Sequence, residues 1–383
     1  MYNICLITGS RAEYGIMKPL IEKLWNDPEC QLDIVATAMH MEEKYGMTYR
    51  VIENDGYVIA KKIFLDLKDT SKQTVTTAIS TLQVALSSYF SENSYDLIVI
   101  LGDRYEMLAV ANVALIYNIP VCHLHGGEKT LGNFDEYIRH AITKMSHLHL
   151  ASTEDYRQRI IQLGESPDKV INTGSLGVEN ALKLPKLHKG ELEEQLGQAL
   201  PNDYYVVLFH PVTLDDEQDA EAQIIALLSA LEIFKESYIF IGSNSDTGSD
   251  LIMAQINRFL KKHKGSSLYR SLTTQQYHSL IRHSKGLIGN SSSGLIEVPS
   301  LEKPTLNIGD RQKGRLHGPS VIDVPVEQDA ILKGLQQLNT IKIFWNPYEK
   351  ENSSQLAYKA IKKALIDGIT TAKDFYDVKG ECE

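Results

Sequence analysis

Short apolar runs alternate with longer amphipathic stretches along the chain, and this alternation predicts the fold class. In the first half, each apolar run has the length of a buried strand, and the stretch after it has the 3.6-residue apolar spacing of a helix. The strands are expected at 3–7, 32–36, 97–101, 120–124 and 149–152, and the helices at 12–25, 39–53, 74–90, 105–118, 135–146 and 154–163. Alternation of this kind is typical of an α/β protein with a parallel sheet covered on both faces.

The second half repeats the pattern, so the chain is expected to form two domains of similar construction. Strands are expected at 204–209, 238–241, 286–288 and 304–307, with helices at 217–234, 250–262 and 275–283. A length of 383 residues also exceeds what one hydrophobic core usually serves. We therefore expect two Rossmann-like domains that face each other across a cleft, residues 1–175 and 176–367, with the connection at the start of the charged, helical segment 175–201.

Charge and hydropathy narrow the classes of partner. The formal net charge of −10 at pH 7 argues against a general nucleic-acid binder. It leaves room for an anionic ligand, because helix N-termini and a few arginines can bind phosphate locally. The start, MYNICLITGS, lacks the features of a signal peptide, and the most apolar stretch, 107–122, is interrupted by Asn112, Asn118 and Pro120. We expect a cytoplasmic protein without a membrane span.

The cysteines and histidines do not suggest a metal or a disulfide framework. Cys5, Cys30, Cys122 and Cys382 form no CxxC motif, which indicates reduced thiols. His147 and His149 would share one face of a strand, but no third residue has metal-ligand spacing. No zinc site and no cofactor are expected.

Carboxylates follow two neighbouring strands in the first half. Asp103 comes directly after the strand at 97–101, Glu128 follows the strand at 120–124, and Asp135 opens the next helix. Ligands bind beyond the carboxyl ends of the strands in open α/β sheets. Local ion pairs, such as Asp135 with Arg139 one turn later, are an alternative explanation for each residue. Together the three carboxylates favour acid/base chemistry, because neighbouring carboxylates have different pKa values.

A second candidate site follows the strand at 286–288. The segment Gly289–Glu297 reads GNSSSGLIE, a small, hydroxyl-rich turn that leads into a helix. Such a turn exposes backbone amides at the positive end of the helix dipole, where a diphosphate could bind, and Glu297 could reach ribose hydroxyls. On the motif alone, an N-terminal helix cap with a capping-box glutamate is the favoured interpretation. A helix cap and a bound diphosphate are compatible with each other in this turn.

Two further positions are open to either interpretation. The segment Thr8–Gly15, TGSRAEYG, is not GxGxxG, and no acidic residue follows the second strand, so a nicotinamide enzyme is not expected. Arg11 at a helix start is either an exposed arginine or the partner of a bound anion. His210 ends the strand 204–209, where it is either a structural histidine or a group that faces the cleft.

Taken in order, these segments resemble a known family. They are GSRAEYG, GDRYE at 102–106, HGGE with DEYIRHAITK, FHPVT at 209–213, GSNSDTGSD at 242–250, and GNSSSGLIE with GDRQKGR at 309–315. The series is similar to the hydrolysing UDP-N-acetylglucosamine 2-epimerases that supply N-acetylmannosamine for bacterial sialic acid. It covers nearly the whole chain. Ala12 stands where the non-hydrolysing enzymes usually have proline.

The resemblance implies a GT-B-like fold with UDP held mainly by the second domain, a homo-oligomer (dimer or tetramer), and a short C-terminal helix, 368–383, that crosses back to the first domain. It gives Asp103, Glu128 and Asp135 as the catalytic carboxylates. Ser292 and Ser293 would contact the diphosphate, with Glu297 on the ribose. The full set of positions it assigns to the UDP-sugar is Arg11, His210, Ser243, Asn244, Leu272, Ser291, Ser292, Ser293, Gly294, Glu297 and Arg311.

The implied reaction converts UDP-N-acetylglucosamine and water to N-acetylmannosamine and UDP. Anti elimination of UDP gives 2-acetamidoglucal, which is then hydrated. The same reaction on UDP-N,N′-diacetylbacillosamine, a GT-B glycosyltransferase and a nucleotide-sugar-binding protein without catalysis remain alternatives. The sequence does not assign which carboxylate is the acid and which is the base.

Overall fold

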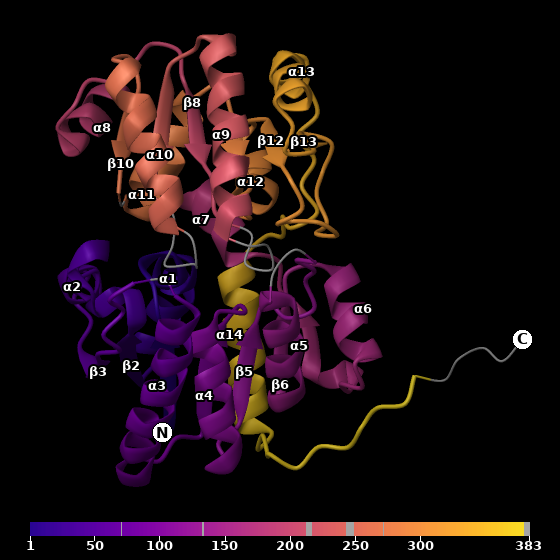
Figure 1. Ribbon diagram of the computed structural model, residues 1–383. Coiled ribbons are helices and arrows are strands. Elements are labelled where there is room, and N and C mark those ends of the chain that lie inside the picture. The colour runs from indigo at the N-terminus through magenta and orange to yellow at the C-terminus, as the bar shows by residue number, and fades with distance from the viewer. Residues whose placement is uncertain (70, 132–133, 212–216, 243–248, 271, 379–383) are drawn as a thin grey trace, which may run out of the picture.

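Two lobes make up the molecule in the computed structural model, and each is a parallel sheet with helices on both faces (Figure 1). The described residues are 1–383 without 70, 132–133, 212–216, 243–248, 271 and 379–383. The α/β class and the two-domain, GT-B-like arrangement expected from the sequence are confirmed.

The first sheet lies in the N-terminal lobe. Its described strands run in the order β3-β2-β1-β4-β5-β6-β7, all parallel. The strands are β1 (Tyr2–Thr8), β2 (Cys30–Thr37), β3 (Ile59–Ile63), β4 (Leu97–Leu101), β5 (Val121–Leu124), β6 (Leu148–Ala151) and β7 (Val170–Asn172), and the helices are α1 (Arg11–Trp25), α2 (Tyr49–Asn54), α3 (Lys72–Glu92), α4 (Tyr105–Ile116), α5 (Asp135–Met145) and α6 (Glu154–Gln162). The strand order reverses between β1 and β4, which is where ligands bind in such sheets.

The second sheet lies in the C-terminal lobe, in the order β10-β9-β8-β11-β12-β13. Its strands are β8 (Tyr205–Leu208), β9 (Tyr238–Ile241), β10 (Ser267–Tyr269), β11 (Leu287–Gly289), β12 (Thr305–Ile308) and β13 (Val321–Val324), and the helices are α7 (Leu176–Lys183), α8 (Lys189–Leu196), α9 (Glu217–Phe234), α10 (Ser249–Lys262), α11 (Thr274–His283), α12 (Ser293–Ile296) and α13 (Gln328–Leu338). Helix α7 lies between the lobes (Figure 1), and Asn180 on it donates to the carbonyl of Gly15 at 2.8 Å.

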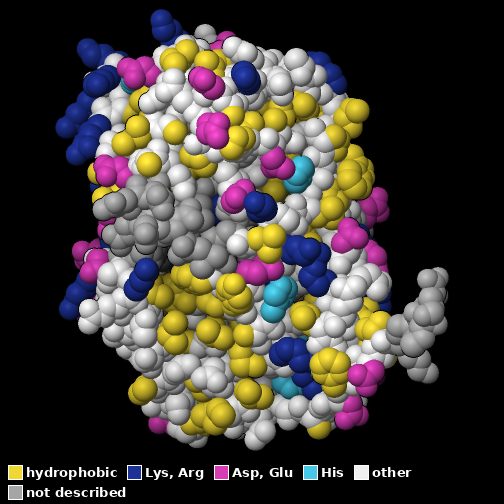
Figure 2. Space-filling view, turned by 45° about the vertical axis from the view of Figure 1, so that its right-hand side comes forward, with side chains coloured by type: hydrophobic (Ala, Val, Ile, Leu, Met, Phe, Trp, Pro, Cys, Tyr) yellow, Lys and Arg dark blue, Asp and Glu magenta, His cyan; other side chains and the backbone are white. Residues whose placement is uncertain are grey.

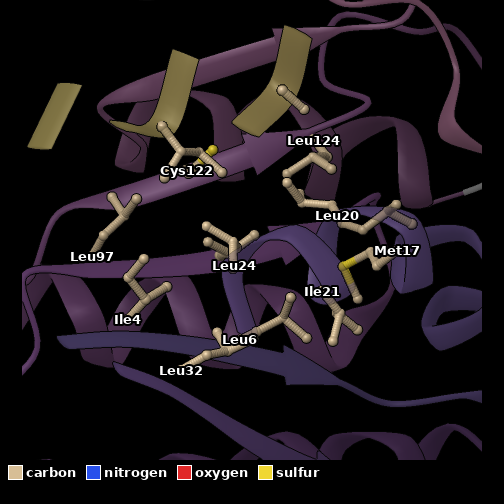
Figure 3. Close-up of a cluster of buried hydrophobic side chains, with 14 of the residues drawn as sticks. Ile4, Leu6, Met17, Leu20, Ile21, Leu24, Leu32, Leu97, Cys122 and Leu124 are labelled. Carbon is tan, nitrogen blue, oxygen red and sulfur yellow. The ribbon is translucent and has the colours of Figure 1, made fainter. Parts of the chain in front are cut away.

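The core of the N-terminal lobe follows from the two-residue period of β1. Ile4 and Leu6 pack against α1 on one face of the sheet, where Leu20 and Leu24 meet them (Figure 3). The neighbouring residues of β1, such as Ile7, face a second cluster with α3 and α4. Because β1 is buried on both faces, its sequence is a continuous apolar run rather than an alternating one.

The return of the chain to the N-terminal lobe differs from expectation. The returning helix is α14 (Ser353–Ile366), part of the segment we assigned to the second domain. Its apolar side, including Ile361 and Leu365, joins the α1 cluster, and Lys362 pairs with Asp27 at 2.8 Å. The helix expected at 368–383 is absent from the described residues 368–378, because Gly368 adopts a left-handed conformation with φ 76° that ends α14.

Other differences are local. The helix expected at 39–53 is interrupted by Gly46, whose φ is 89°, and divides into the 3-10 turns Ala38–Met41 and Glu43–Tyr45 followed by α2. The short or partly polar strands β3, β7, β10 and β13 were not expected, and neither were the helices α13 and α14. On the face of the molecule shown in Figure 2, lysine and arginine side chains stand beside aspartate and glutamate on both lobes.

Candidate active site

Neighbouring strands bring two of the predicted carboxylates to one edge of the first sheet. Strands β4 and β5 pair in parallel, with Leu101 opposite Leu124, and the turns that follow them carry Asp103 and Glu128. The second turn requires glycine: Gly127 has φ 76°, and a Cβ there would collide with the carbonyl oxygen of Tyr156. The sequence HGGE therefore folds tightly enough to turn Glu128 back into the protein.

Arg139 on α5 connects these turns. Its side chain is fully buried, and its guanidinium donates to the Asp103 carboxylate, to the carbonyl of Glu128 at 3.0 Å and to Thr130 Oγ1 at 2.7 Å. Burial lowers the pKa of Arg139, but the charges of Asp103 and Glu128 and the hydrogen bond to Asp103 together outweigh it and raise that pKa. Arg139 thus stays charged and links Asp103 to the backbone of the turn that carries Glu128.

Glu128 is almost fully buried, with 2% of its surface exposed. It accepts a hydrogen bond from Ser152 Oγ at 2.9 Å and lies 3.2 Å from His125 Nδ1 and 2.8 Å from Arg315 Nη2. Burial alone would raise the pKa of Glu128, but Arg315 and His125 outweigh it and hold the pKa well below its usual range. The residue is therefore a carboxylate at neutral pH.

Asp135, the third predicted carboxylate, is the first residue of α5 and is half-buried. It lies one helical turn before Arg139, which pairs with Asp103 and, at 2.9 Å, with Glu136. The alternative that each carboxylate merely forms a local ion pair is therefore wrong for Asp103, whose partner comes from another element of the lobe.

Arg315 comes from the other lobe. It belongs to the segment 309–315 that follows β12. The backbone of that segment also contacts the N-terminal lobe, because the Leu131 amide donates to the carbonyl of Lys313 at 3.2 Å. Arg315 is 8% exposed; burial lowers its pKa, but Glu128 and the other acidic groups around it outweigh burial and raise that pKa. An ion pair between the lobes thus closes over a predicted catalytic group.

The same segment contacts the hydroxyl-rich turn of the C-terminal lobe. Arg311 Nη1 and Gln312 Nε2 donate to the carbonyl of Asn290 at 3.2 and 3.0 Å. The side chain of Asn290 forms two hydrogen bonds with the backbone of His210, at 2.7 and 2.8 Å, and so joins the ends of β8 and β11. His210 itself is buried.

Within the turn, the serine side chains contact one another. Ser291 Oγ lies 3.1 Å from Ser293 Oγ, which also pairs with the hydroxyl of Tyr277 at 2.6 Å. Ser292 occupies the N-cap position of α12, but its side chain forms no capping hydrogen bond. The capping-box interpretation is therefore wrong. Gly294 is buried against Thr305, so its lack of a side chain serves packing as well.

Glu297 faces the interior rather than the backbone amides of its helix. Its Oε2 lies 3.2 Å from His278 Nε2, and a Cβ on Gly177 would lie 2.5 Å from its Oε1. Leu272 packs in the core of the C-terminal lobe with its side chain buried, and its assignment to the UDP-sugar stays a prediction. Ser243 and Asn244 lie outside the described residues.

Arg11 opens α1, where it is half-buried, and burial lowers its pKa to about 10. Arg139 and Arg315 were missed as site residues. The first follows Asp135 at one helical turn and the second ends GDRQKGR, so both lie inside segments that carry the family resemblance. Their partners, however, are far away in the sequence.

Taken together, the fold and this arrangement define a GT-B-like protein whose two Rossmann-like domains meet at the carboxyl ends of their strands. The chain belongs to the UDP-N-acetylglucosamine 2-epimerase family, whose profile matches residues 22–362.

Individual relatives are similar over most or all of their length. The polysialic acid biosynthesis protein P7 of Escherichia coli is 49% identical and is aligned over 100% of this chain and 99% of its own. The GDP/UDP-N,N′-diacetylbacillosamine 2-epimerase (hydrolyzing) of Campylobacter jejuni is 41% identical over 84% of each chain. The crystal structure of the Neisseria meningitidis UDP-GlcNAc 2-epimerase bound to UDP-GlcNAc is 20% identical, with a TM-score of 0.77 over 94% of this chain and 100% of that one.

Other expectations concern metals, thiols and membranes. Among the described residues, no three histidine, cysteine, aspartate or glutamate side chains are grouped as metal ligands. Cys5, Cys30 and Cys122 are free and buried, and Cys382 lies outside the described part. No helix in the described ranges has the length and hydrophobicity needed to cross a membrane.

Proposed function

We propose that this protein is a hydrolysing UDP-N-acetylglucosamine 2-epimerase that releases N-acetylmannosamine and UDP for sialic acid synthesis. The observation that carries the proposal is the segment 309–315, which contacts Glu128 in one lobe and the turn at Asn290 in the other. A UDP-sugar held by the serine turn would therefore have its sugar near the carboxylates. The family and the identity to a polysialic acid biosynthesis protein support the substrate and the route.

The chemistry requires both carboxylates near the sugar and hydrogen-bond donors or cations near the diphosphate. In the first step the bond between C1 and the phosphate oxygen breaks, the C2 proton leaves to a base, and a C1=C2 double bond forms. The C2–H bond is weakly acidic, so departure of UDP leads and positive charge builds at C1. Glu128, as a carboxylate, would stabilise that charge or accept the proton. Serine hydroxyls and Arg11 would meet the negative charge on UDP.

In the second step, water adds its oxygen to C1 and a proton is delivered to C2 from the opposite face, which inverts that centre. The two faces of the glycal need two different groups, and Asp103, Glu128 and Asp135 supply enough carboxyls for both. Arg139 would hold Asp103 in position for this task. The elimination and the hydration balance in atoms and electrons without a cofactor.

The test is incubation of the purified protein with UDP-N-acetylglucosamine in deuterium oxide. We expect UDP and N-acetylmannosamine with one deuterium at C2. UDP-N-acetylmannosamine as the product would place the protein in the non-hydrolysing class, and a product without deuterium would exclude the glycal route. Turnover without an added acceptor would also separate this function from that of a glycosyltransferase.

The carboxylates are tested by isosteric variants. Asp103→Asn, Glu128→Gln and Asp135→Asn are each expected to lower kcat on the order of 10²-fold or more, with the fold retained in circular dichroism. Glu136→Gln is a matched control, because that carboxylate also pairs with Arg139 but is not in the predicted catalytic set. Near-normal turnover by all three variants would remove these groups from the mechanism.

A second substrate is favoured by the comparisons, because two relatives named as hydrolysing epimerases of N,N′-diacetylbacillosamine are 41% and 33% identical. The two sugars differ at C4 and C6. Measuring kcat/KM for both UDP-sugars under the same conditions decides between them.

A further inference from the structure

Glu13 occupies a turn that other Rossmann-like domains keep for phosphate. It lies in the first turn of α1 and is 5% exposed. Its Oε2 accepts hydrogen bonds from the backbone amides of Gly9 at 2.7 Å and Ser10 at 3.2 Å. In dinucleotide-binding folds, the amides after the first strand receive a diphosphate. Here the protein's own carboxylate fills that place.

A second buried carboxylate, Glu106 on α4, contacts the same cation as Glu13, which is Arg104. Glu106 is fully buried, and its two oxygens accept from Nε and Nη2 of Arg104, each at 3.1 Å. The Nε atom of Arg104 is also 3.8 Å from Glu13 Oε1. Arg104 therefore lies between the two carboxylates as their shared cation.

This cluster joins two turns that carry predicted site residues. The turn after β1 leads to Arg11, and the turn after β4 carries Asp103 beside Arg104. The strands are neighbours in the sheet, with Leu6 opposite Val99. A Cβ added at Gly9 would lie 3.6 Å from the Glu106 carboxyl carbon, so the first turn rests against the second carboxylate.

The charges in the cluster depend on one another. Burial raises the pKa of Glu13 to about 7; Arg104 opposes this rise and Glu106 adds to it. Two carboxylates this close are stable as ions only while the cation stays between them. The side chain of Arg104, 14% exposed, is thereby fixed inward rather than extended into solvent.

We propose that Glu13 and Glu106 are positioning residues that, through Arg104, fix the turn of Arg11 against the turn of Asp103. The proposal rests on the proposed function, since it assumes that these two turns carry site residues. Both residues lie behind the site. Among the described residues, the hydrogen bonds and ion pairs of Glu13 and Glu106 reach neither the predicted catalytic carboxylates nor the serine turn.

The test is the double variant Glu13→Gln/Glu106→Gln, which removes both ionisable carboxyl groups with little change of volume and leaves Arg104 near enough to the surface to be hydrated. We expect kcat with UDP-N-acetylglucosamine to fall roughly 10- to 100-fold, because displacement of catalytic groups by about 1 Å costs that much, while KM changes less than about threefold. The stoichiometry of UDP binding, measured by calorimetry, should stay as in the wild type. A kcat within about twofold of the wild type would overturn the proposal.

Two controls separate positioning from damage to the fold. Glu154→Gln removes a carboxylate from the more exposed pair with Arg157 on α6, and we expect wild-type kcat. A loss of kcat in the double variant that parallels a loss of UDP-binding sites would indicate unfolded protein and also overturn the proposal.

A further measurement does not depend on the substrate. In native-state hydrogen exchange, the amides of Gly9, Ser10 and residues 102–104 should exchange at least about threefold faster in the double variant, with the rest of the lobe unchanged. Unchanged exchange overturns the proposal even if the wild type does not act on UDP-N-acetylglucosamine. Absence of turnover by the wild type, with the expected exchange, would contradict only the proposed function.

Discussion

Replacement of Arg315 by methionine removes the cation that pairs with Glu128 across the lobe junction. Methionine matches much of the arginine side chain in length and adds no charge. Glu128 is left with Ser152 and His125 as its near partners, at 2.9 and 3.2 Å. The carboxylate then remains almost fully buried without the ion that offsets its burial.

The size of the effect follows from the burial of both groups. Their side chains are 6% and 3% exposed at a separation of 2.8 Å, so this pair is unlike a surface salt bridge. Removing one partner of a buried pair typically costs about 3–5 kcal/mol, because the other charge stays in a poorly solvated place. Since Glu128 and Arg315 belong to different lobes, separation of the lobes would rehydrate the carboxylate. We therefore expect the variant to shift toward separated lobes by on the order of 10²-fold or more.

The assay is a double-mutant cycle of Arg315→Met and Glu128→Gln, followed by small-angle scattering and by urea unfolding. Arg315→Met alone should increase the radius of gyration and lower the urea midpoint. The double variant should recover much of both losses, since a neutral amide is less costly to bury than a carboxylate. Arg315→Lys keeps the charge without the planar guanidinium and should fall between the wild type and Arg315→Met.

Additive effects in the cycle would refute this reasoning, because they would mean that the two side chains do not interact. An unchanged scattering profile and urea midpoint for Arg315→Met would do the same. Activity is deliberately not the primary readout, since Glu128 is itself expected to take part in the reaction.

Two predictions concern other parts of the molecule. Gly177→Ala places a methyl group 2.5 Å from Glu297 Oε1 and should weaken UDP binding on the order of tenfold in calorimetry, whereas Gly190→Ala, where nothing lies within 4 Å, should leave it unchanged. Equal affinities of the two variants for UDP would mean that Glu297 does not contribute to UDP binding. Burial raises the pKa of Glu165, but hydrogen bonds from His149, Lys144 and Lys373 outweigh it and lower that pKa to about 2. Its stabilisation is therefore present above the unfolded pKa of about 4.3 and is lost as the pH falls toward 2. Glu165→Gln should lower Tm at pH 7 and flatten its decline between about pH 5 and 2; a parallel decline would contradict this.

The fold could be predicted from the sequence because buried parallel strands and amphipathic helices leave distinct patterns. Strands such as β4 and β5 are short apolar runs, and their carboxyl ends meet at one edge of the sheet, so the sequence alone is enough to place Asp103 and Glu128 together. The strands that were missed are short, and β3, with the sequence IAKKI, is too polar to be predicted as a buried strand. Helix α14 was not predicted, and its regular apolar spacing would not have told which lobe it packs against.

The contacts of the site could be predicted less well than its members. Arg139 and Arg315 stand inside recognisable segments, yet a sequence does not say that one guanidinium joins two strand-end turns or that another crosses between lobes. The serine turn shows the opposite case. Its composition favoured a helix cap, but α12 has only four residues and the side chain of Ser292 makes no capping bond. Packing of Gly294 and the contact of Ser293 with Tyr277 determine the turn instead.

The arrangement pairs a buried carboxylate of one lobe with a cation of the other lobe. Burial at the junction opposes the ionised form of Glu128, and Arg315 together with His125 offsets that cost and keeps the pKa of Glu128 low. The same segment that supplies Arg315 also holds the turn at Asn290, where we place the diphosphate. Docking of the lobes would therefore keep Glu128 charged while it is withdrawn from water and bring it near the sugar in one event. A carboxylate that stays charged in the docked state would act on a sugar that is already shielded from bulk water, which is where elimination must precede hydration.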